Sequence, residues 1–193
     1  MTSNANIVYF CHRSDLRHWL GKNANTQKEL WIKSTRSAND DNGLYYLDIV
    51  EEALCFGWID STCKRMDDGC LFQRISPRKK NSNWSELNKE RCRRLIKLGL
   101  MTPEGKKALP SLAKNSFKME KWLSDILKSD RIVWKNMKSF PELYVRIRLY
   151  NIQWYEKNLS HEKAMKYLET FINATRTGKM YGAWNDGGRL LNY

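Results

Sequence analysis

The chain has 193 residues, of which 34 are Lys or Arg and 21 are Asp or Glu, so its formal net charge is +13. Hydrophobic residues make up 41% of the sequence, which is enough to build a core and excludes wholesale disorder. The charge excludes an acidic solvating protein, and the length allows one domain or a core with a smaller second unit.

The first part of the chain predicts a mixture of strands and helices. Ser14 is expected to cap a short helix, and residues 29–34 are typical of a strand. Residues 47–57 carry apolar side chains at helical spacing. An Asp-Asp-Gly turn at 67–69 predicts a β-hairpin over residues 58–76. With the earlier strand, this hairpin would form a small antiparallel β-sheet of about three strands.

The rest of the chain predicts helices. Asn83 is expected to cap a helix over residues 84–98. Further helices are predicted at 103–109, 117–128, 131–138, 142–157 and 161–177. Residues 179–193 are expected to form an extended tail. We therefore predict an α+β fold, with an α+β core at 1–115 and a helical C-terminal module with its tail at 116–193.

The cysteines indicate a reducing compartment. They do not form a CxxC pair, and the sequence has only three histidines, so free thiols are favoured over disulfides or a zinc site. We predict no metal and no cofactor. Residues 1–10 lack the pattern of a signal peptide, and no apolar run approaches the ~20 residues of a membrane span. We expect a soluble, cytoplasmic protein.

The excess of positive charge begins after residue 60. Residues 1–60 have a net charge of −2, residues 61–107 of +8 and residues 108–193 of +7. The loop and helix start near residue 80 form a candidate anion-binding strip, because helix N-termini attract anions. Its residues are Lys79, Lys80, Lys89, Arg93 and Lys97. The alternative is a solvated helix face with a Glu90–Arg94 pair.

Three stretches of the sequence carry a resemblance to a known family. They are EEALCFGWID at 51–60, SPRKKNSNWSELNK at 76–89 and LMTPEG at 100–105. In order and spacing they resemble the YdeI/OmpD-associated family, whose members are often labelled bacteriocin-protection proteins. The resemblance covers most of residues 10–110 and continues more loosely through the C-terminal helices. It implies a link to resistance against membrane-active peptides, and it implies no reaction, cofactor or catalytic residue.

The motif residues allow two interpretations. Asp60 could pair with Arg78 and tie the hairpin to the following loop, which is a purely structural role. Alternatively, aromatic walls and converging polar groups could form a small-molecule pocket. The candidate ligand-binding residues are Trp58, Asp60, Arg78, Ser82, Trp84 and Asn88.

Cys55 could in principle be a nucleophile, but a buried and inert thiol is the favoured interpretation. We find no catalytic motif and therefore assign no catalytic residue. The sequence favours a binding or accessory protein whose basic loop and helix contact an anionic ligand or partner, with nucleic acid as one option. The alternative is a small-molecule enzyme or sensor that uses the pocket around Trp58.

Overall fold

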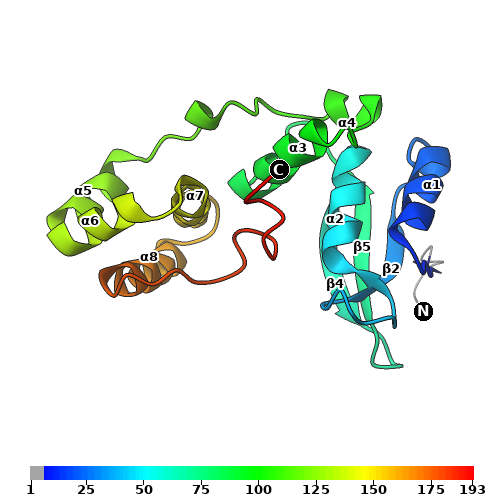
Figure 1. Cartoon of the computed structure of the whole chain (residues 1–193), viewed down its shortest axis with the longest axis horizontal. Helices are drawn as coiled ribbons and strands as arrows, with labels where there is room; N and C mark the ends of the chain where they lie inside the picture. Colours follow the sequence, from blue (N-terminus) through cyan, green and yellow to red (C-terminus); the bar gives the residue numbers. More distant parts are fainter. Residues whose placement is uncertain (1–6) are drawn as a thin grey trace. The chain divides into compact units, whose positions relative to one another are not determined.

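The computed structural model describes residues 7–193, which divide into two compact units (Figure 1). The first unit contains residues 7–83 and Arg91–Pro110. The second unit contains Trp84–Glu90 and Ser111–Tyr193. The chain therefore passes between the two units three times, at residues 83/84, 90/91 and 110/111, and the second of these positions falls within a helix. The division at 115/116 stays a prediction.

A mixed β-sheet with the strand order β1-β2-β5-β4 forms the framework of the first unit. β4 (Trp58–Arg65) and β5 (Leu71–Pro77) form the predicted hairpin, and β5 also runs antiparallel to β2 (Leu30–Thr35). β1 (Ile7–Val8) and β3 (Leu44–Tyr45) pair with β2 in parallel. The α+β class is confirmed, but the expected sheet of three antiparallel strands is too simple. A two-residue strand is too short to show the alternation that marks strands in a sequence.

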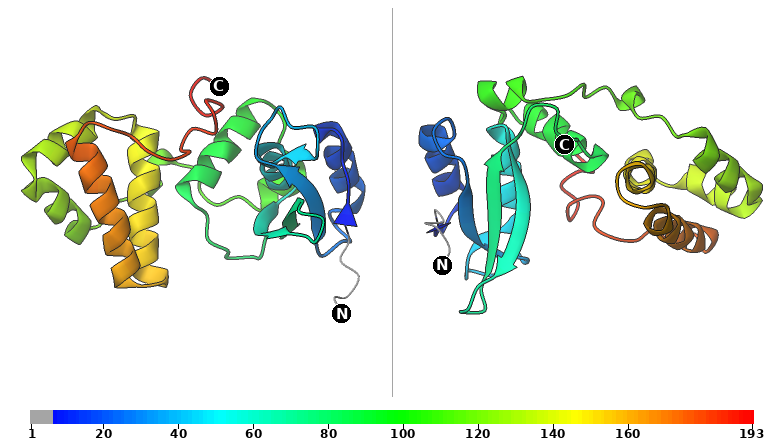
Figure 2. Two further views of the ribbon diagram at one scale, coloured as in Figure 1. Left: turned by 90° about the horizontal axis from the view of Figure 1, so that it is seen from below. Right: turned by 180° about the vertical axis from the view of Figure 1, so that it is seen from behind.

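Two helices contribute to the core of the first unit. α2 (Tyr46–Cys55) packs on the sheet, and α1 (Arg13–Asn23) packs against α2 (Figure 2). Ser14 is not the cap of α1, because the helix already begins before it. His12 occupies the N-cap, and its backbone N–H donates to Asp15 at 3.2 Å. The core of this unit consists of Leu16, Leu20, Leu30, Ile32, Leu44, Ile49, Ala53, Trp58 and Ile75.

Two adjacent carboxylates of α2 are buried with arginine partners. Glu51 and Glu52 are each 1% exposed. Arg13 contacts both of them, at 2.7 Å and 2.6 Å respectively. Arg17 binds Glu52 at 2.9 Å, and Arg94 binds Glu51 at 2.7 Å. Because a buried carboxylate is costly without a partner, these contacts fix α1 and the end of α3 (Glu86–Lys97) to α2.

The main chain at the C-terminal end of α2 lies directly against the segment of residues 102–105. The carbonyl of Cys55 accepts hydrogen bonds from both the backbone N–H and the hydroxyl of Thr102, at 3.1 Å and 2.6 Å. Thr102 also caps the short helix α4 (Pro103–Lys107) through the N–H of Gly105. A Cβ on Gly105 would lie 2.1 Å from the Cys55 oxygen, so only glycine fits there.

The helix α3 (Glu86–Lys97) begins later than its sequence predicts. The hydroxyl of Ser85 accepts a hydrogen bond from the backbone N–H of Asn88 at 3.2 Å, which is the contact of a helix cap. Ser85 therefore takes the role that we predicted for Asn83. At the other end, Gly99 has a positive φ of 70° and follows the helix as expected.

The second unit is helical, with α7 and α8 lying side by side (Figure 2). Its elements are η1 (Lys114–Ser116), α5 (Lys121–Ser129), α6 (Arg131–Ser139), α7 (Glu142–Asn158) and α8 (His161–Arg176). The predicted helix at 117–128 starts only at Lys121. The amide of Gln153 binds the preceding segment, accepting from the N–H of Glu120 at 2.9 Å and donating to the carbonyl of Lys118 at 3.1 Å.

The end of the chain packs against these helices rather than extending as a tail. Residues 179–193 form a series of turns, in which Trp184 and Leu190 are buried. The ring of Trp184 lies 5.7 Å from that of Tyr144, which is fully buried and also contacts Phe171. The prediction of an extended tail was wrong because aromatic residues spaced between glycines gave no helical or strand period.

A buried arginine lies among three glutamates in the second unit. Arg146, only 5% exposed at its side chain, contacts Glu86 at 2.9 Å, Glu90 at 2.6 Å and Glu142 at 2.8 Å. The hydroxyl of Tyr193 donates to Glu90 at 2.6 Å. The start of α3, the start of α7 and the last residue of the chain therefore share one polar cluster.

The Glu52→Gln substitution tests the buried charges of the first unit. It removes a charge from between Arg13 and Arg17, and we expect it to lower the free energy of unfolding by about 3 kcal/mol. Glu104→Gln is the matched control, because Glu104 is exposed and makes no ion pair within residues 7–193. It should change stability by less than about 0.5 kcal/mol. Urea unfolding measures both, and equal effects would contradict a stabilising role for the cluster.

Candidate functional site

Trp58 is a core residue in the structure. Its side chain is 1% exposed, and its indole N–H donates to the carbonyl of Ala24 at 3.2 Å. The ring packs edge-on against Trp19, with 6.2 Å between the centroids. A tryptophan that is enclosed and hydrogen-bonded in this way supports the sheet rather than the wall of an open pocket.

Asp60 has a nearby hydroxyl partner. The carboxylate of Asp60 accepts a hydrogen bond at 2.8 Å from the hydroxyl of Tyr46, the first residue of α2. Burial, and then the negative charge of Asp60, raise the pKa of Tyr46. The guanidinium of Arg36 lies over this ring, 4.5 Å from its centroid. Asp60 thus joins the bulged strand β4 to α2.

Arg78 organises the loop that follows the hairpin. Its guanidinium donates to the hydroxyl of Ser82 at 3.3 Å and to the carbonyl of Asn83 at 2.9 Å. Burial lowers the pKa of Arg78, whereas Cys92 and Asp60 act in the opposite direction. Arg78 is therefore within the electrostatic influence of Asp60. The direct Asp60–Arg78 ion pair stays a prediction.

The remaining two candidates belong to the second unit. Trp84 is 9% exposed, and Asn88 lies in the first turn of α3, where its backbone binds the cap residue Ser85. Trp58 and the other three candidates belong to the first unit. The predicted pocket thus draws its residues from both units, and it stays a prediction.

The residues of the predicted anion-binding strip differ in their exposure and in their partners. Lys79 and Lys80 are exposed, and neither makes an ion pair within residues 7–193. Lys89 is different, because Glu86 one turn earlier holds its ammonium at 2.8 Å and leaves the side chain 15% exposed. Arg93 is half-buried and Lys97 is exposed. The loop lysines are the members most open to an anion.

Glu90 and Arg94, the pair that the sequence suggests on a solvated face of α3, have other partners in the structure. Arg94 contacts Glu51 at 2.7 Å, and Glu90 contacts Arg146 at 2.6 Å. Helical spacing places Glu90 and Arg94 on one face, but each has a partner from another helix instead.

Cys55 and Cys92 are buried thiols. Burial raises the pKa of Cys55 to about 11 and that of Cys92 to about 12. A raised pKa keeps a thiol protonated at neutral pH, and the thiolate is the reactive form. This environment favours the inert interpretation of Cys55 over the nucleophile.

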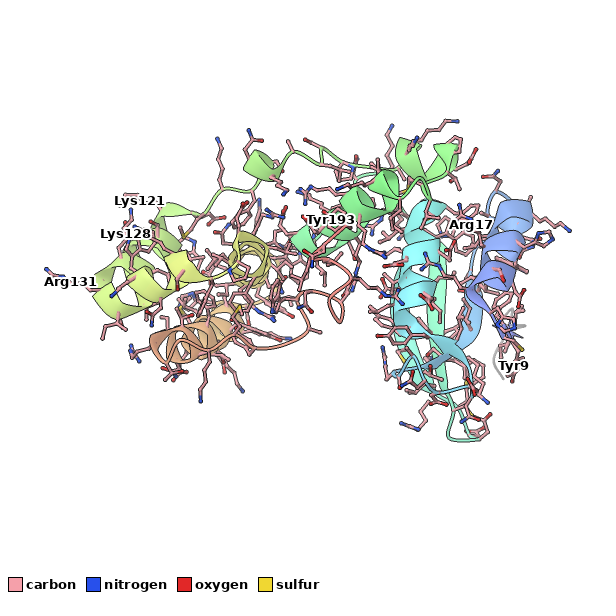
Figure 3. The ribbon with its side chains drawn as sticks, in the orientation of Figure 1. Tyr9, Arg17, Lys121, Lys128, Arg131 and Tyr193 are labelled. Atoms are coloured by element: carbon pink, nitrogen blue, oxygen red, sulfur yellow. The ribbon has the colours of Figure 1, made fainter. Side chains whose placement is uncertain are left out.

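Another basic surface lies on the second unit, where α5 turns into α6. A hollow of about 530 Å³ is lined there by Lys128, Arg131, Trp134, Lys135, Lys138 and Ser139, a set that we call the α5–α6 basic surface. The ammonium groups of Lys128 and Lys138 lie 5.4 Å and 4.9 Å from the centroid of the Trp134 ring. Figure 3 labels Lys128 and Arg131 at the junction of these two helices.

The folding of α6 explains this concentration of charge. Val133 and Met137 face the core, and the opposite side presents Arg131, Trp134 and Lys135. Spacings of three and four residues place side chains on one helical face. One face of a nine-residue helix is thus committed to packing and the other to positive charge.

The acidic group closest along the chain is already engaged. Asp130 caps α6 by accepting from the backbone N–H groups of Ile132 and Val133, and its carboxylate contacts Arg176 at 2.8 Å. The N–H of Val133 and then Arg176 lower the pKa of Asp130. Within residues 7–193, the four cations of the α5–α6 basic surface make no ion pair. Their charge is available to a ligand.

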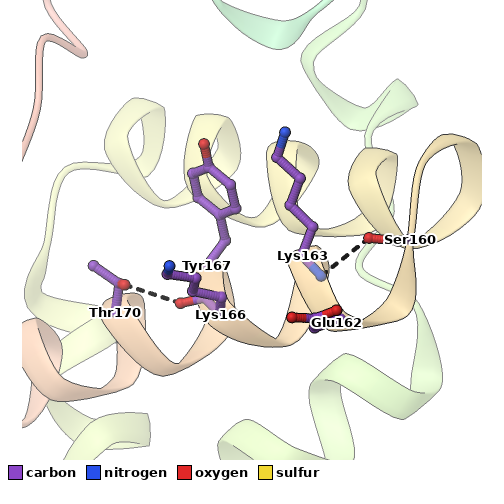
Figure 4. A pocket seen from close by; sticks show the side chains of 6 residues that line it. All are labelled: Ser160, Glu162, Lys163, Lys166, Tyr167 and Thr170. Atoms are coloured by element: carbon purple, nitrogen blue, oxygen red, sulfur yellow. Dashed lines mark hydrogen bonds between the residues drawn. The ribbon is translucent and has the colours of Figure 1, made fainter.

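A second hollow lies along the exposed face of α8 (Figure 4) and is less suited to an anion. Its lining includes Glu162 beside Lys163 and Lys166. Its hydroxyl groups also have helical partners, since Ser160 caps the helix and Thr170 donates to the carbonyl of Lys166 at 2.9 Å. Mixed charge and occupied hydroxyls leave little for a specific ligand.

Fold and surface together define an α+β protein that carries a basic surface around a tryptophan on a helical unit. Residues 8–108 match the family described as domain of unknown function (DUF8412), and the match covers more than half of the chain, so the protein belongs to this family. No curated protein and no solved structure matches it. The resemblance to the YdeI/OmpD-associated family stays a prediction.

Two further properties concern the described part of the chain. Among residues 7–193 there is no group of three or more His, Cys, Asp or Glu side chains placed to hold a metal ion. No helix there combines the length and apolar character needed to cross a membrane.

The accessibility of the thiols can be tested directly. We expect an aromatic disulfide reagent at about pH 8 to modify the exposed Cys11 and Cys63 in the native protein, and Cys55 and Cys92 only after denaturation. Absorbance and peptide mass spectrometry measure which thiols react. Fast modification of Cys55 in the folded protein, absent from a Cys55→Ala variant, would restore the nucleophile hypothesis.

Proposed function

We propose that the protein is a non-enzymatic binding protein and that the α5–α6 basic surface holds a nucleic-acid strand by its phosphates. The observation that carries this proposal is a group of four cations that share one hollow and make no ion pair within residues 7–193. No carboxylate lines that hollow. A phosphate could approach it without displacing a carboxylate, since these four cations make no ion pair within residues 7–193.

Trp134 restricts the positions of two lysine side chains on this surface. Trp134 is half-buried and attracts the ammonium groups of Lys128 and Lys138 by cation–π interactions. Lysine side chains otherwise lose considerable conformational entropy when they are fixed. The ring therefore reduces the cost of positioning these two charges for a ligand.

Several charges at short spacing favour a phosphate chain over a single anion. Lysine ammonium groups act as compact point charges toward phosphates, and binding of a strand releases its condensed counterions. Exposed Lys79 and Lys80 of the first unit add positive charge that fits the same class of ligand. The net charge of +13 assists the approach of any polyanion.

We also propose a reducing, cytoplasmic setting for this activity. It is supported by the exposed free cysteines Cys11 and Cys63, which would be prone to oxidation elsewhere. A link to resistance against membrane-active peptides would follow from the YdeI/OmpD-associated resemblance alone. Neither proposal is needed for nucleic-acid binding.

Nucleic-acid binding can be tested with a fluorescein-labelled single strand of about 20 nucleotides. If four cations contact phosphates, log Kd should depend on log salt concentration with a slope of magnitude near 3. The double variant Lys128→Gln/Lys135→Gln should weaken binding about 25-fold at about 0.1 M salt, because each lost contact costs about fivefold there. Fluorescence anisotropy measures both quantities.

The matched control is Lys157→Gln/Lys163→Gln, which removes the same charge from α7 and α8 of the same unit. It should weaken binding much less than the first pair of substitutions. Equal losses in the two double variants would show that only net charge matters and would reject this surface as the site. Stronger binding of a poly-glutamate peptide than of the strand would replace nucleic acid by an acidic protein partner.

A further inference from the structure

We propose that a second site in the helical unit binds a single-chain aliphatic carboxylate of the fatty-acid class. The site is a groove of about 620 Å³ between η1, the segment that follows it, and the facing sides of α6 and α7. This volume is within the usual range for small-molecule sites, which are largely apolar with a few polar groups. The groove shares Lys138 with the α5–α6 basic surface, but its other lining residues lie outside that surface, and the inference does not depend on nucleic-acid binding.

Apolar side chains form the floor and walls of the groove. Met137 and Leu149 are buried at its floor, and four half-buried side chains surround them. These wall residues are Phe117, Met119, Phe140 and Val145. Aromatic rings and flexible methionine side chains suit an alkyl chain, because they can adapt to its bends. The part of the ligand that enters the groove should therefore be hydrocarbon.

One wall is held in place without a ligand. The segment between η1 and α5 has no helical hydrogen bonds of its own to fix Phe117 and Met119. The amide of Gln153 on α7 holds this segment instead, through the N–H of Glu120 and the carbonyl of Lys118. A wall that is already ordered lowers the entropy cost of binding.

The polar groups at the rim determine the head group. Lys114 and Lys138 line the groove, are exposed and make no ion pair within residues 7–193. The opposite charges in the lining, Glu142 and Arg146, pair with each other at 2.8 Å. The lysines alone are therefore left for a ligand, and they select an anionic head group.

The buried cluster behind Arg146 sets the direction of the ligand. Glu86 and Glu90 also contact this arginine, so the charge of Arg146 is already bound by three carboxylates, Glu142 included. A carboxylate head group would be repelled there and attracted to Lys114. The alkyl chain should thus run along the apolar walls with its head group at the η1 side.

Isothermal titration calorimetry with octanoate, decanoate and dodecanoate below their micelle concentrations tests the apolar part. Each added methylene that enters the groove should tighten binding by about fourfold. Val145→Trp should fill the groove and weaken dodecanoate binding at least tenfold. Leu159→Trp is the matched control, because Leu159 is 56% exposed at the end of α7 and does not line the groove.

Dodecanol and the Lys114→Gln variant test the head group. Dodecanol should bind at least tenfold more weakly than dodecanoate to the wild-type protein, and Lys114→Gln should reduce this preference. Lys118→Gln is the control for charge, since Lys118 is exposed and does not line the groove. Equal binding of dodecanol and dodecanoate, or an affinity independent of chain length, would overturn the proposal.

Size-exclusion chromatography tests the alternative that a second copy of the chain occupies the groove. A dimer that dissociates on addition of dodecanoate and is absent from Val145→Trp would identify a second copy of the chain as the natural occupant, and this would also overturn the proposal. A wild-type protein whose elution is unchanged by dodecanoate, combined with the calorimetric chain-length series, supports it. Lys114 and Val145 lie outside the α5–α6 basic surface, so nucleic-acid binding should persist in both variants.

Discussion

The first unit depends on the neutralisation of Glu51 and Glu52. These two carboxylates lie in the most buried helix of the unit, where an unpaired charge would destabilise the fold. Arginines from α1 and α3 approach from different sides and satisfy them. Packing of apolar side chains alone would allow these helices to slide, whereas charge-assisted hydrogen bonds define one arrangement. The sheet, the hairpin and the loop at Arg78 are built around this arrangement.

The second unit uses the same principle with the charges reversed. Arg146 is the buried cation, and the glutamates around it come from α3 and α7. The cluster holds the start of α7 in position, and α7 in turn supports both the groove and, through α8, the helix that carries the basic surface. Rigid elements under a binding surface keep its charges in place, which is a condition for selective recognition.

The sequence predicts the local elements well because their causes are local. The Asp-Gly turn defines the hairpin, and the apolar spacing of residues 47–57 defines α2. The ion pairs could not be predicted in this way, since Arg13 and Glu52 are 39 residues apart and no local pattern relates them. Trp58 illustrates the same limit, because a tryptophan in a motif fits a core or a pocket equally well until its neighbours are known.

The candidate surface shows a different limit. Its signal is present in the sequence as cations at 128, 131, 135 and 138 around Trp134, but the excess of charge near residue 80 is higher and favours that region as the anion site. The two regions differ in how far internal partners use their charges. Lys89 and Arg94 are paired to glutamates, whereas the four cations of the α5–α6 basic surface have no ion-pair partner among the described residues.

The contact between Gly105 and the carbonyl of Cys55 has a consequence for evolution. Thr102 and Gly105 recognise the main chain of α2 and not its side chains, so this contact is indifferent to which residue occupies position 55. This contact thus places no requirement on the side chain at position 55, whereas it requires glycine at position 105. A homologous chain that carries a larger residue at the position of Gly105 must have moved α4 away from α2, and that single position would report such a divergence.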